Sequence, residues 1–529
     1  MNTSLLTLAD LAQLLTTKGL LSDATTLGQD AQDIAVTGAD CDSRVVEPHH
    51  LFICKGAAFK SAYLVSAREK GACGYLADEA HADELSSLMP DFPALIATNL
   101  RGAMAWVAKA AYGNPDEDLA TIGITGTKGK STTTYMLRAI LEGNDPYSAC
   151  GLIGSIETYD GVTSQESVNT TPESPDLWRY LAHMRDRSLR YAVMEVSSQA
   201  LKYDRVLGLK LDIAGFLNIG EDHISPLEHP NWDDYFQSKL KIFSQAKCAV
   251  VNLNSDHVDE ILERAHACQK LVTFGANRPD ADIWAEGIES ACGFVTFTCH
   301  TPEWAGPITL TMPGTFNVEN ALCAIACATE LHVPYEQIAE GLARTKVPGR
   351  MELIQTPNAK VTGIVDFAHN KMAFEKFFPS VVKDFPDHHV IAVFGATGDK
   401  ATERRFELPA VAGKFADRLI FTKDDPGHEK PEDICRAMVE ATPEGVPCEI
   451  VPDREAAIAR AVELGFAADG PAVICVLGRG TEGVQHECGK LIPAPLDADL
   501  FQDAVRDWCA KHPEDAKALR KRVVSAMLV

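Results

Sequence analysis

The sequence predicts an α/β protein of three domains: a small N-terminal α/β domain, a central parallel-sheet domain and a C-terminal Rossmann-like domain. Its 529 residues exceed what one hydrophobic core usually serves. Strand-like apolar runs alternate with helical patterns in two separate series, which is typical of doubly wound sheets. The expected domain boundaries are residues 1–115, 116–349 and 350–529.

Strand-like and helical runs follow one another in each of the three segments. The first segment mixes helical stretches with short apolar runs, "DIAVTGADCDSRVV" and "HLFICKG". The central series contains "DLATIGITG", "YAVMEVSS", "LDIAGFLNI" and "CAVVNLN", and it closes with the helix "NVENALCAIACATELH". The last series contains "VTGIVDFAH", "HHVIAVFGA", "DRLIFTKDD" and "PAVICVLGRG", and we expect its ligand crevice at the carboxyl ends of these strands.

Charge and composition exclude several classes of protein. A net charge of -25 argues against a nucleic-acid-binding surface, and 46% hydrophobic residues argue against wholesale disorder. No apolar run approaches the roughly 20 residues that span a bilayer. The N-terminal stretch predicts an amphipathic helix and not an export signal, and the scattered cysteines favour a reducing cytoplasm. Cys323 and Cys327, inside the alanine-rich helix, are expected in the core.

The stretch "GITGTKGKS" predicts a phosphate-binding loop between a strand and a helix, which makes the centre a P-loop ATPase domain. Its glycines let backbone N–H groups turn inward at the positive end of the helix. Lys130 can reach phosphate oxygens and Ser131 can ligate Mg²⁺. A strict Walker A pattern requires glycine where Ile124 stands, so an ordinary glycine-rich turn is the alternative. The expected nucleotide-binding residues here are Gly126, Thr127, Lys128, Gly129, Lys130, Ser131 and Thr132.

Ten motifs in order resemble the Mur ligases, the ATP-dependent enzymes that build the peptidoglycan stem peptide. They are "DSRVVEPHHLFICKG", "GTKGKS", "NTTPESP", "MEVSSQAL", "NIGEDH", "DDYFQSKLKIF", "MPGTFNVENALCA", "VPGRME", "DFAHN" and "TKDDP". "DSR", "TTP" and "EVSS" are most similar to the branch that adds the third residue to UDP-N-acetylmuramoyl-L-alanyl-D-glutamate. The resemblance implies an acyl-phosphate intermediate, a free amino acid as second substrate, and a monomer.

The resemblance also implies two Mg²⁺ ions. Glu195 ends a strand-like run and corresponds to a metal-binding glutamate; the alternative is a strand-end acid bonded to an amide. His223 corresponds to the family's histidine at the second magnesium ion, although a loop histidine is more often structural or exposed. Lys239 corresponds to a lysine that carries CO₂ as a carbamate, and we expect Lys241 to stay unmodified; on spacing alone, Lys239 is a solvated helical lysine. The implied metal ligands are Ser131, Glu195, His223 and carbamylated Lys239, and the implied catalytic residues are Lys130, Glu195, His223, Lys239 and Arg350.

Further positions follow from the same resemblance. Asn317 and Asn320 correspond to residues on the adenine side, with helix capping as the alternative for Asn317. Arg350 corresponds to an arginine on the phosphates and Asp366 to a ribose-binding aspartate. This chain departs from the family at Gln199, where histidine is common, and at Tyr203, two residues before Arg205, where the family often has a polar residue. The implied acceptor-binding residues are Ser43, Arg44, Thr170, Thr171, Ser197 and Arg205.

The amino acid that enters is predicted from "TKDDPGHE". Enzymes for meso-diaminopimelate commonly show Asp-Asn-Pro-Arg, whereas this chain has Asp424-Asp425-Pro426-Gly427, without the guanidinium that pairs with a second carboxylate. Asp424, Asp425 and Glu482 favour an ammonium group instead, so L-lysine is expected first and L-ornithine second. meso-Diaminopimelate stays open if Arg479 replaces the missing arginine, and a simple polar turn is the other interpretation.

Two rival functions remain. A folylpolyglutamate-synthetase-like ligase shares the scaffold, but it lacks the "DSR…LFICKG" first domain. A non-catalytic nucleotide switch would not require a second metal site. Acceptor-dependent ATP turnover separates these alternatives from the ligase.

Overall fold

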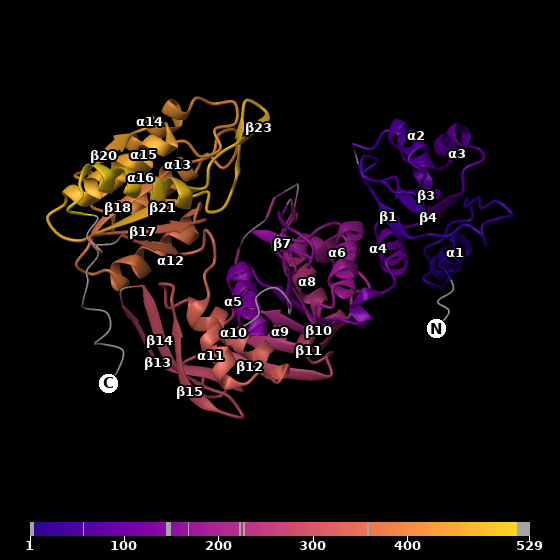
Figure 1. The fold of residues 1–529 in the computed structure, drawn as a ribbon, viewed down its shortest axis with the longest axis horizontal. Helices are drawn as coiled ribbons and strands as arrows, with labels where there is room; N and C mark the ends of the chain where they lie inside the picture. The colour runs from indigo at the N-terminus through magenta and orange to yellow at the C-terminus, as the bar shows by residue number, and fades with distance from the viewer. Residues whose placement is uncertain are drawn as a thin grey trace. The chain divides into compact units, whose positions relative to one another are not determined.

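The computed structural model describes residues 5–56, 58–143, 150–167, 169–221, 224–225, 228–291, 293–356 and 359–515. These residues form two compact units. The first comprises those up to Trp284, with His300–Trp304 and Glu319–Gly341; the second comprises those of 285–299, 305–318 and from Leu342 on. Three larger β-sheets follow one another along the chain, each accompanied by helices, and they confirm the predicted α/β fold class (Figure 1). The boundaries near residues 115 and 349 stay predictions.

The first sheet is parallel throughout, in the order β1-β2-β3-β4. A capping box between Thr7 and Asp10 starts the first helix, which buries Leu8, Leu11 and Leu15, so the predicted amphipathic helix is confirmed. The strands are β1 (Gly38–Asp40), β2 (His50–Ile53), β3 (Gly74–Asp78) and β4 (Ala94–Ala97); the helices are α1 (Leu8–Thr17), α2 (Ser61–Glu69), η1 (Glu79–His81), α3 (Ala82–Leu88) and α4 (Leu100–Ala111).

The central sheet of the first unit runs in the order β12-β11-β10-β5-β9-β6-β7-β8 and is parallel from β12 to β6. Its inner strands are mostly apolar and buried, as expected where helices cover both faces of such a sheet, with Thr121, Thr125 and Glu195 among the buried polar exceptions. The strands are β5 (Ala120–Thr125), β6 (Cys150–Ile153), β7 (Glu157–Tyr159), β8 (Ser164–Glu166), β9 (Tyr191–Glu195), β10 (Leu211–Phe216), β11 (Ala246–Asn252) and β12 (Lys270–Ala276). The helices are η2 (Pro115–Glu117), α5 (Lys130–Glu142), α6 (Ser174–Asp186), α7 (Ser198–Lys202), α8 (Trp232–Leu240), η3 (Lys241–Gln245), α9 (Val258–Ala265), α10 (Asn317–Glu330) and α11 (Tyr335–Arg344).

Register within this sheet brings three loops to one edge. Ile124 of β5 pairs with Glu195 of β9, and Thr125 pairs with Phe216 of β10. The carboxyl ends of β10, β5 and β9 are therefore adjacent. The segments that follow these three strands carry "NIGEDH", "GTKGKS" and "EVSS".

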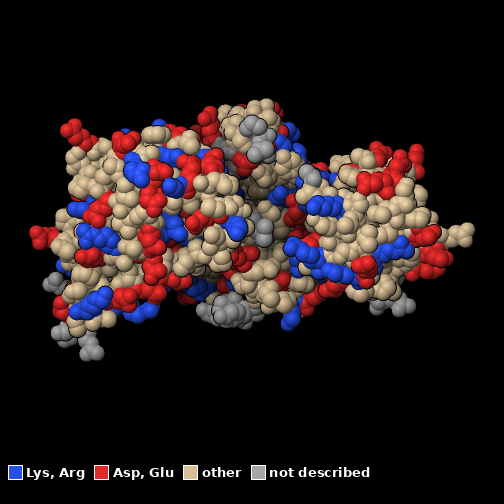
Figure 2. Space-filling view, turned by 90° about the horizontal axis from the view of Figure 1, so that it is seen from above, with Lys and Arg blue, Asp and Glu red and all other residues tan. Residues whose placement is uncertain are grey.

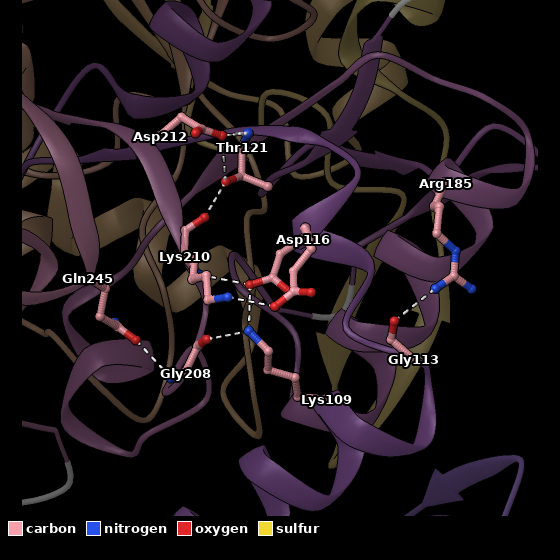
Figure 3. Close-up of polar contacts among 10 residues, drawn as sticks. Lys109, Gly113, Asp116, Thr121, Arg185, Gly208, Lys210, Asp212 and Gln245 are labelled. Atoms are coloured by element: carbon pink, nitrogen blue, oxygen red, sulfur yellow. Dashed lines mark hydrogen bonds and ion pairs between the residues drawn. The ribbon is translucent and has the colours of Figure 1, made fainter. Parts of the chain in front are cut away.

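A buried ion pair joins α4 to the amino-terminal ends of β5 and β10 (Figure 3). Lys109 Nζ lies 2.6 Å from Asp116 Oδ2 and donates to the carbonyl of Gly208 at 2.8 Å. The Lys210 amide donates to the same Asp116 oxygen at 3.0 Å. Both charged side chains are at most 5% exposed, so this buried pair ties α4 to the segments that precede β5 and β10.

The second unit contains a six-stranded sheet in the order β16-β17-β21-β18-β19-β20, antiparallel only at β16. Alternate residues of its central strand pack on opposite faces: Val473 and Cys475 lie in one apolar cluster, and Ile474 and Val476 lie in another. The sheet is therefore covered on both faces, as the Rossmann-like prediction requires. Its strands are β16 (Glu352–Gln355), β17 (Val361–Asp366), β18 (His389–Phe394), β19 (Arg418–Phe421), β20 (Cys448–Ile450) and β21 (Ala472–Leu477). β22 (Val484–Glu487) and β23 (Lys490–Pro493) form a separate two-stranded sheet, and β13 (Ile283–Ala291), β14 (Phe294–His300) and β15 (Ala305–Leu310) come earlier in the chain. The helices are α12 (Lys371–Asp384), α13 (Arg404–Ala412), α14 (Pro431–Glu440), α15 (Arg454–Ala467) and α16 (Asp497–Lys511).

Surface and core agree with the compositional analysis. On the face seen in Figure 2, acidic and basic side chains are interspersed without an extended basic area. In the part of the chain that the structure describes, no helix is long and apolar enough to cross a membrane. Cys323 and Cys327 are fully buried, as expected of core residues.

Candidate functional site

The loop between β5 and α5 is built on two glycines with positive φ, 153° at Gly126 and 90° at Gly129. A Cβ at Gly126 would lie 2.9 Å from Cβ of Leu217, and one at Gly129 would overlap Oδ1 of Asn320. Side chains are therefore excluded at both positions, and the backbone can approach a ligand closely. Lys130 opens α5, so the loop leads directly into the amino terminus of that helix.

Contacts with the segment after β10 hold the loop in place. The amide of Thr127 donates to the Asn218 carbonyl at 3.0 Å, and the amide of Lys128 donates to Asn218 Oδ1 at 2.9 Å. The Asn218 side chain returns a hydrogen bond to the Lys128 carbonyl at 3.0 Å. Thr127 Oγ1 lies 2.9 Å from the Tyr235 hydroxyl on α8. These contacts hold the loop backbone from both neighbouring segments.

Two lysines meet at one carbonyl oxygen of this loop. Lys130 Nζ donates to the Gly126 carbonyl at 2.9 Å, and Lys239 Nζ donates to the same oxygen at 3.0 Å. Lys239 is only 2% exposed, so the interpretation of a solvated helical lysine is wrong. It also lies 4.9 Å from the centre of the Tyr235 ring. The predicted residues Lys130 and Lys239, from different helices, are thus brought together.

Glu195 ends β9 with a carboxylate that is 1% exposed. Its Oε1 accepts a hydrogen bond from the Ser155 amide at 2.7 Å, and its Oε2 accepts from the Ser155 hydroxyl at 3.2 Å. Gly154 leaves room for this group, because a Cβ there would lie 2.6 Å from Oε1. The buried acid is therefore satisfied by one neighbouring residue while standing on the strand next to the phosphate loop.

The predicted acceptor-binding residues of the central domain, two before α6 and two after β9, form a connected group. Thr171 Oγ1 donates to the Glu195 carbonyl at 2.9 Å and accepts from the Ser197 amide at 3.0 Å. Thr170 Oγ1 accepts from the Ser155 hydroxyl at 2.9 Å. Arg205 donates to the Thr171 carbonyl at 3.1 Å. Thr170, Thr171, Ser197 and Arg205 therefore surround the end of the strand that carries Glu195.

Three cations surround Glu173 beside this group. Lys55 lies 2.9 Å from its carboxylate, Arg205 lies 3.0 Å away and Arg101 lies 3.4 Å away. Desolvation raises the pKa of Glu173, but the hydrogen bond and charge of Lys55 outweigh it and the pKa is lowered. Glu173 therefore holds Arg205 as an ionised partner.

Ser43 and Arg44 follow β1 in the first sheet. Ser43 is buried, and its carbonyl and that of Arg44 each accept from Lys70 Nζ at 2.8 Å. The Arg44 side chain is 86% exposed and lies 2.6 Å from Asp42, whose hydrogen bond to this guanidinium lowers the pKa of the carboxyl. Arg44 is thus accessible to a ligand at the carboxyl end of β1.

The predicted adenine-side asparagines have different surroundings. Asn320 is 6% exposed and meets the phosphate loop at Gly129. Asn317 is 1% exposed, and its Nδ2 donates to the Pro313 carbonyl at 2.8 Å, so it secures the turn before α10.

Arg350 and Asp366 belong to the second unit. Asp366 accepts from the amides of Met351 at 2.7 Å and Ala368 at 2.8 Å, so its carboxylate ties the turn at 349–351 to the end of β17. The Arg350 guanidinium lies 4.5 Å from the Phe367 ring centre and donates to the Gly349 carbonyl at 3.0 Å. The structure therefore places Asp366, at the end of β17, against the turn that contains Arg350.

The acids predicted to receive the amino acid follow β19 and β21. Asp424 is 7% exposed, and burial raises its pKa. Burial and then the charges of Asp424 and Asp425 raise the pKa of Glu482 to about 7. Asp425 instead accepts from the His486 amide at 2.9 Å, which occupies one of its oxygens. Asp424 and Glu482 are thus electrostatically coupled acids near the carboxyl ends of the sheet.

Arg479 and Gly427 complete this region. Arg479 is 2% exposed, and its Nη2 donates to the carbonyl of Glu482 at 2.6 Å. Burial and then the charge of Arg454 lower its pKa. Gly427 has a φ of 60°, and a Cβ there would overlap the Asp399 carboxylate, whose Oδ2 accepts from the His428 amide at 2.9 Å. The position is therefore shaped for glycine by its own turn.

Sequence reasoning assigned no role to several residues that hold this site. Tyr235 and Lys239 are four residues apart and share a face of α8, a spacing that could have paired them. Asn218 stands inside the quoted motif "NIGEDH", but its contacts with residue 128 span 90 positions and no local pattern shows them. The predicted metal ligand His223 lies outside the described residues.

The donor set suits magnesium. Magnesium prefers oxygen ligands and usually takes one or two carboxylates with phosphate oxygens and water. Glu195 at the end of β9 would supply a carboxylate, Ser131 in the first turn of α5 a hydroxyl, and Lys239 oxygen as a carbamate. Among the described residues, no three His, Cys, Asp or Glu side chains are grouped to hold a metal by themselves. These donors therefore fit an ion whose shell nucleotide phosphates and water complete.

The parallel sheet, the glycine-turned loop opening a helix and the two lysines at that loop define a nucleoside-triphosphate-binding protein with a further α/β unit. The Mur ligase middle domain matches residues 124–328, and the Mur ligase glutamate ligase domain matches residues 349–480. The chain belongs to the Mur ligase family, and it is therefore an ATP-dependent ligase that forms amide bonds.

Full-length relatives support the same assignment. The chain is 35% identical over 486 residues to a UDP-N-acetylmuramoyl-L-alanyl-D-glutamate--L-lysine ligase of Enterococcus faecalis, covering 91% of this chain and 93% of that one. It is 36% identical over 453 residues to the enzyme of the same name from Streptococcus pyogenes, covering 85% and 89%. A solved UDP-N-acetylmuramoyl-L-alanyl-D-glutamate--2,6-diaminopimelate ligase shares the fold with a TM-score of 0.67 at 22% identity, covering 96% of this chain and all of that one.

Proposed function

We propose that this chain adds L-lysine to UDP-N-acetylmuramoyl-L-alanyl-D-glutamate, using ATP, in the synthesis of peptidoglycan precursors. Addition of a third amino acid to the UDP-linked dipeptide follows from the relatives, which match nine tenths of both chains. The choice of L-lysine depends on the coupled acids Asp424 and Glu482. We further propose that the enzyme is a cytoplasmic monomer.

An ammonium group suits the surroundings of these two acids. Burial raises the pKa of both acids, and the charge of Asp424 raises that of Glu482 further, so a further negative charge beside Glu482 is disfavoured. A cation that enters there would ionise Glu482 and form a charge-assisted hydrogen bond. A second carboxylate, as in meso-diaminopimelate, would instead meet like charge.

Two features keep the other amino acids as alternatives. L-Ornithine differs from L-lysine by one methylene, which a pocket discriminates only weakly. Arg479 Nε is buried without a hydrogen-bond partner, so a carboxylate that reached it would satisfy this donor and favour meso-diaminopimelate. Against this alternative, the other end of the Arg479 guanidinium is already committed to the Glu482 carbonyl.

The reaction proceeds in two steps. The D-glutamyl side-chain carboxylate of the acceptor attacks the γ-phosphorus of ATP; a C–O–P bond forms, the bond to the β-phosphate oxygen breaks and ADP leaves. The amine of the amino acid then attacks the acyl carbon, phosphate leaves and the nitrogen loses a proton. When bound, magnesium neutralises charge on the phosphate oxygens.

The described residues supply positioning and charge. Backbone N–H groups at Gly129 and Lys130 would contact the phosphates, since Asn218 holds those of Thr127 and Lys128. The Lys130 ammonium would stabilise the negative charge of the transferring group. Thr171 and Arg205 orient the acceptor beside Glu195. Asn317, Asn320, Arg350 and Asp366 remain the proposed nucleotide contacts, and Ser43 and Arg44 the proposed contacts with the UDP-sugar.

We propose that Lys239 acts as a carbamate. The ammonium groups of Lys130 and Lys239 both donate to one carbonyl oxygen, which concentrates positive charge where a divalent cation is needed. Reaction of the neutral Lys239 amine with CO₂ forms an N–C bond, releases one proton and leaves an anionic oxygen ligand. Lys241, two residues further along, is exposed and provides the matched control.

Labelled bicarbonate tests this modification. We expect ¹³C-bicarbonate to give a carbamate signal that Lys239→Ala abolishes and Lys241→Ala retains, and we expect small carboxylates to restore part of the Lys239→Ala activity. An active enzyme with a bare Lys239 amine, together with an unrescued variant, would contradict the proposal.

The lysine assignment is tested with L-norleucine, which lacks the ε-ammonium but keeps the chain length. Wild-type enzyme is expected to use L-lysine and reject L-norleucine, whereas Glu482→Gln should raise the KM for L-lysine at least about tenfold, since a charge-assisted hydrogen bond contributes about 1.5–3 kcal/mol. The KM for the acceptor should not change. An unchanged KM for L-lysine in Glu482→Gln and Asp424→Asn would remove these acids from the amine site.

A further inference from the structure

A fully buried histidine links α7 to α8. His229 is 0% exposed; its Nδ1 lies 2.6 Å from Asp234 Oδ2, and its Nε2 lies 3.0 Å from Ser198 Oγ. Asp234 Oδ2 also accepts from Lys202 Nζ at 2.7 Å. The contacts thus run from Ser198 at the start of α7 through His229 to Asp234 in the first turn of α8, and back to Lys202 at the end of α7.

The chemistry of the partners fixes the direction of these hydrogen bonds. The hydrogen bond from Lys202 holds the pKa of Asp234 low, so this carboxylate accepts and Nδ1 of His229 carries the proton. Nε2 is then the acceptor for the Ser198 hydroxyl. This is the hydrogen-bond order of a Ser–His–Asp triad. Because Ser198 is only 4% exposed, we assign the chain of contacts to positioning and not to nucleophilic attack.

Both helices tied by His229 lead to the phosphate loop. Asp234 is followed by Tyr235, whose hydroxyl lies 2.9 Å from Thr127 Oγ1. One turn further along α8, Lys239 Nζ lies 3.0 Å from the Gly126 carbonyl. On the other side, Ser198 follows the β9 segment that carries Glu195 by three residues. Rotation of α8 would therefore move Lys239 and Tyr235 away from the loop together.

The backbone of His229 contributes a further restraint. The Ser225 amide donates to the His229 carbonyl at 3.0 Å, so the segment between β10 and α8 is closed at this residue. The His229 ring also packs edge-on against Tyr235, with ring centres 5.2 Å apart. His229 therefore contacts both the side chains and the backbone that set the orientation of α8.

We propose that His229 is a positioning residue that holds Lys239 and Tyr235 against the phosphate loop. Its effect on turnover rests on the proposed function, whereas its effect on the position of Lys239 does not. The residue does not touch substrate in this account; it acts through α8. Removing it should lower kcat with little change in the KM of the acceptor.

The test compares His229→Gln with two other variants of the full chain. Ser198→Ala removes only the Nε2 hydrogen bond and keeps the Asp234 contact. His183→Gln is the matched control. His183 lies on α6, with its Nδ1 2.7 Å from Oδ2 of Asp160 after β7, so this variant removes a His–Asp pair that includes no residue of α7 or α8. Thermal melting reports the folded fraction, steady-state kinetics gives kcat and KM, and a crystal structure of each variant gives the distance from Lys239 Nζ to the Gly126 carbonyl.

We expect His229→Gln to lower kcat per folded enzyme at least about tenfold, Ser198→Ala to lower it severalfold and His183→Gln to leave it unchanged. We also expect the Lys239 contact to lengthen beyond hydrogen-bonding distance in His229→Gln. If His229→Gln fails to fold, the same distance and kcat are measured in Ser198→Ala. A folded variant that retains the wild-type distance and kcat would overturn the inference. Loss of the contact in His229→Gln, together with a wild-type chain that shows no ligase activity, would support the inference and count against the proposed function.

Discussion

Gly129→Ala is expected to destabilise the first unit through two separate effects. The residue has a φ of 90°, a conformation that costs a side-chain-bearing residue about 1–2 kcal/mol. Its new Cβ would overlap Oδ1 of Asn320 and lie 3.0 Å from the Asn320 Cγ. Because Asn320 is 6% exposed, it has little room to move, and such overpacking costs about 1–3 kcal/mol. The sum is a loss of about 2–5 kcal/mol.

Gly19→Ala separates the two effects. Gly19 also has a positive φ, 69°, but a Cβ there would meet nothing within 4 Å. It belongs to the same unit, so it shares the backbone strain without the clash. The difference between the two variants is therefore the contribution of Asn320, and Asn320→Ala in the Gly129→Ala background should recover most of it.

Tryptophan fluorescence during urea unfolding provides the assay. Five of the six tryptophans lie in the first unit and only Trp508 in the second, so the signal reports chiefly the unit that carries the mutation. ATP affinity, measured on the same variants, should fall at least about tenfold in Gly129→Ala, which corresponds to about 1.4 kcal/mol. Equal stability of Gly129→Ala and Gly19→Ala, or no recovery with Asn320→Ala, would refute the described contact between the loop and α10.

Three further predictions concern the buried Lys109–Asp116 pair, the acid Glu482 and the turn at Gly427. Lys109→Met should lower the free energy of unfolding by about 3–5 kcal/mol because it leaves Asp116 buried and unpaired, and Lys109→Met/Asp116→Leu should recover part of this loss in urea unfolding. The pKa of Glu482 is raised from 4.5 to about 7, so between these pH values the folded state binds more protons than the unfolded state. The free energy of unfolding should therefore fall as pH rises through this window. Glu482→Gln should abolish this pH dependence in thermal melts at about pH 4 to 8. Gly427→Arg alone should give an unstable protein without activity towards meso-diaminopimelate, whereas adding Asp399→Ala should restore folding by removing the overlap, as thermal melting would show; a stable single variant would contradict this contact.

The α/β fold, the phosphate-binding loop and the strand that ends at Glu195 were predictable from the sequence because they depend on local patterns. Apolar runs predicted a strand leading into "GTKGKS" and a strand ending at Glu195, and β5 and β9 confirm both. That these two strands are neighbours was seen only in the structure. Lys239 was found only through the family resemblance, since its helical spacing favoured an exposed side chain. Its burial depends on the fold around α8.

The contacts that hold the site were not predictable from local patterns. Tyr235 meets Thr127 across 108 positions of sequence, and His229 meets Ser198 across 31. Such pairs depend on which strands are adjacent, and hydrophobic periodicity does not specify that order. At Gly427 the sequence showed only that no guanidinium is available to pair with a second substrate carboxylate. The positive φ and the neighbouring Asp399 became evident in the structure.

The identity of the incoming amino acid is the most direct test of the account. Enzyme, ATP, magnesium and UDP-N-acetylmuramoyl-L-alanyl-D-glutamate would be incubated with equimolar L-lysine, L-ornithine and meso-diaminopimelate, and the UDP-linked products identified by mass. We expect the L-lysine product to dominate, with one phosphate released for each amide bond formed. Exclusive formation of the meso-diaminopimelate product would contradict it.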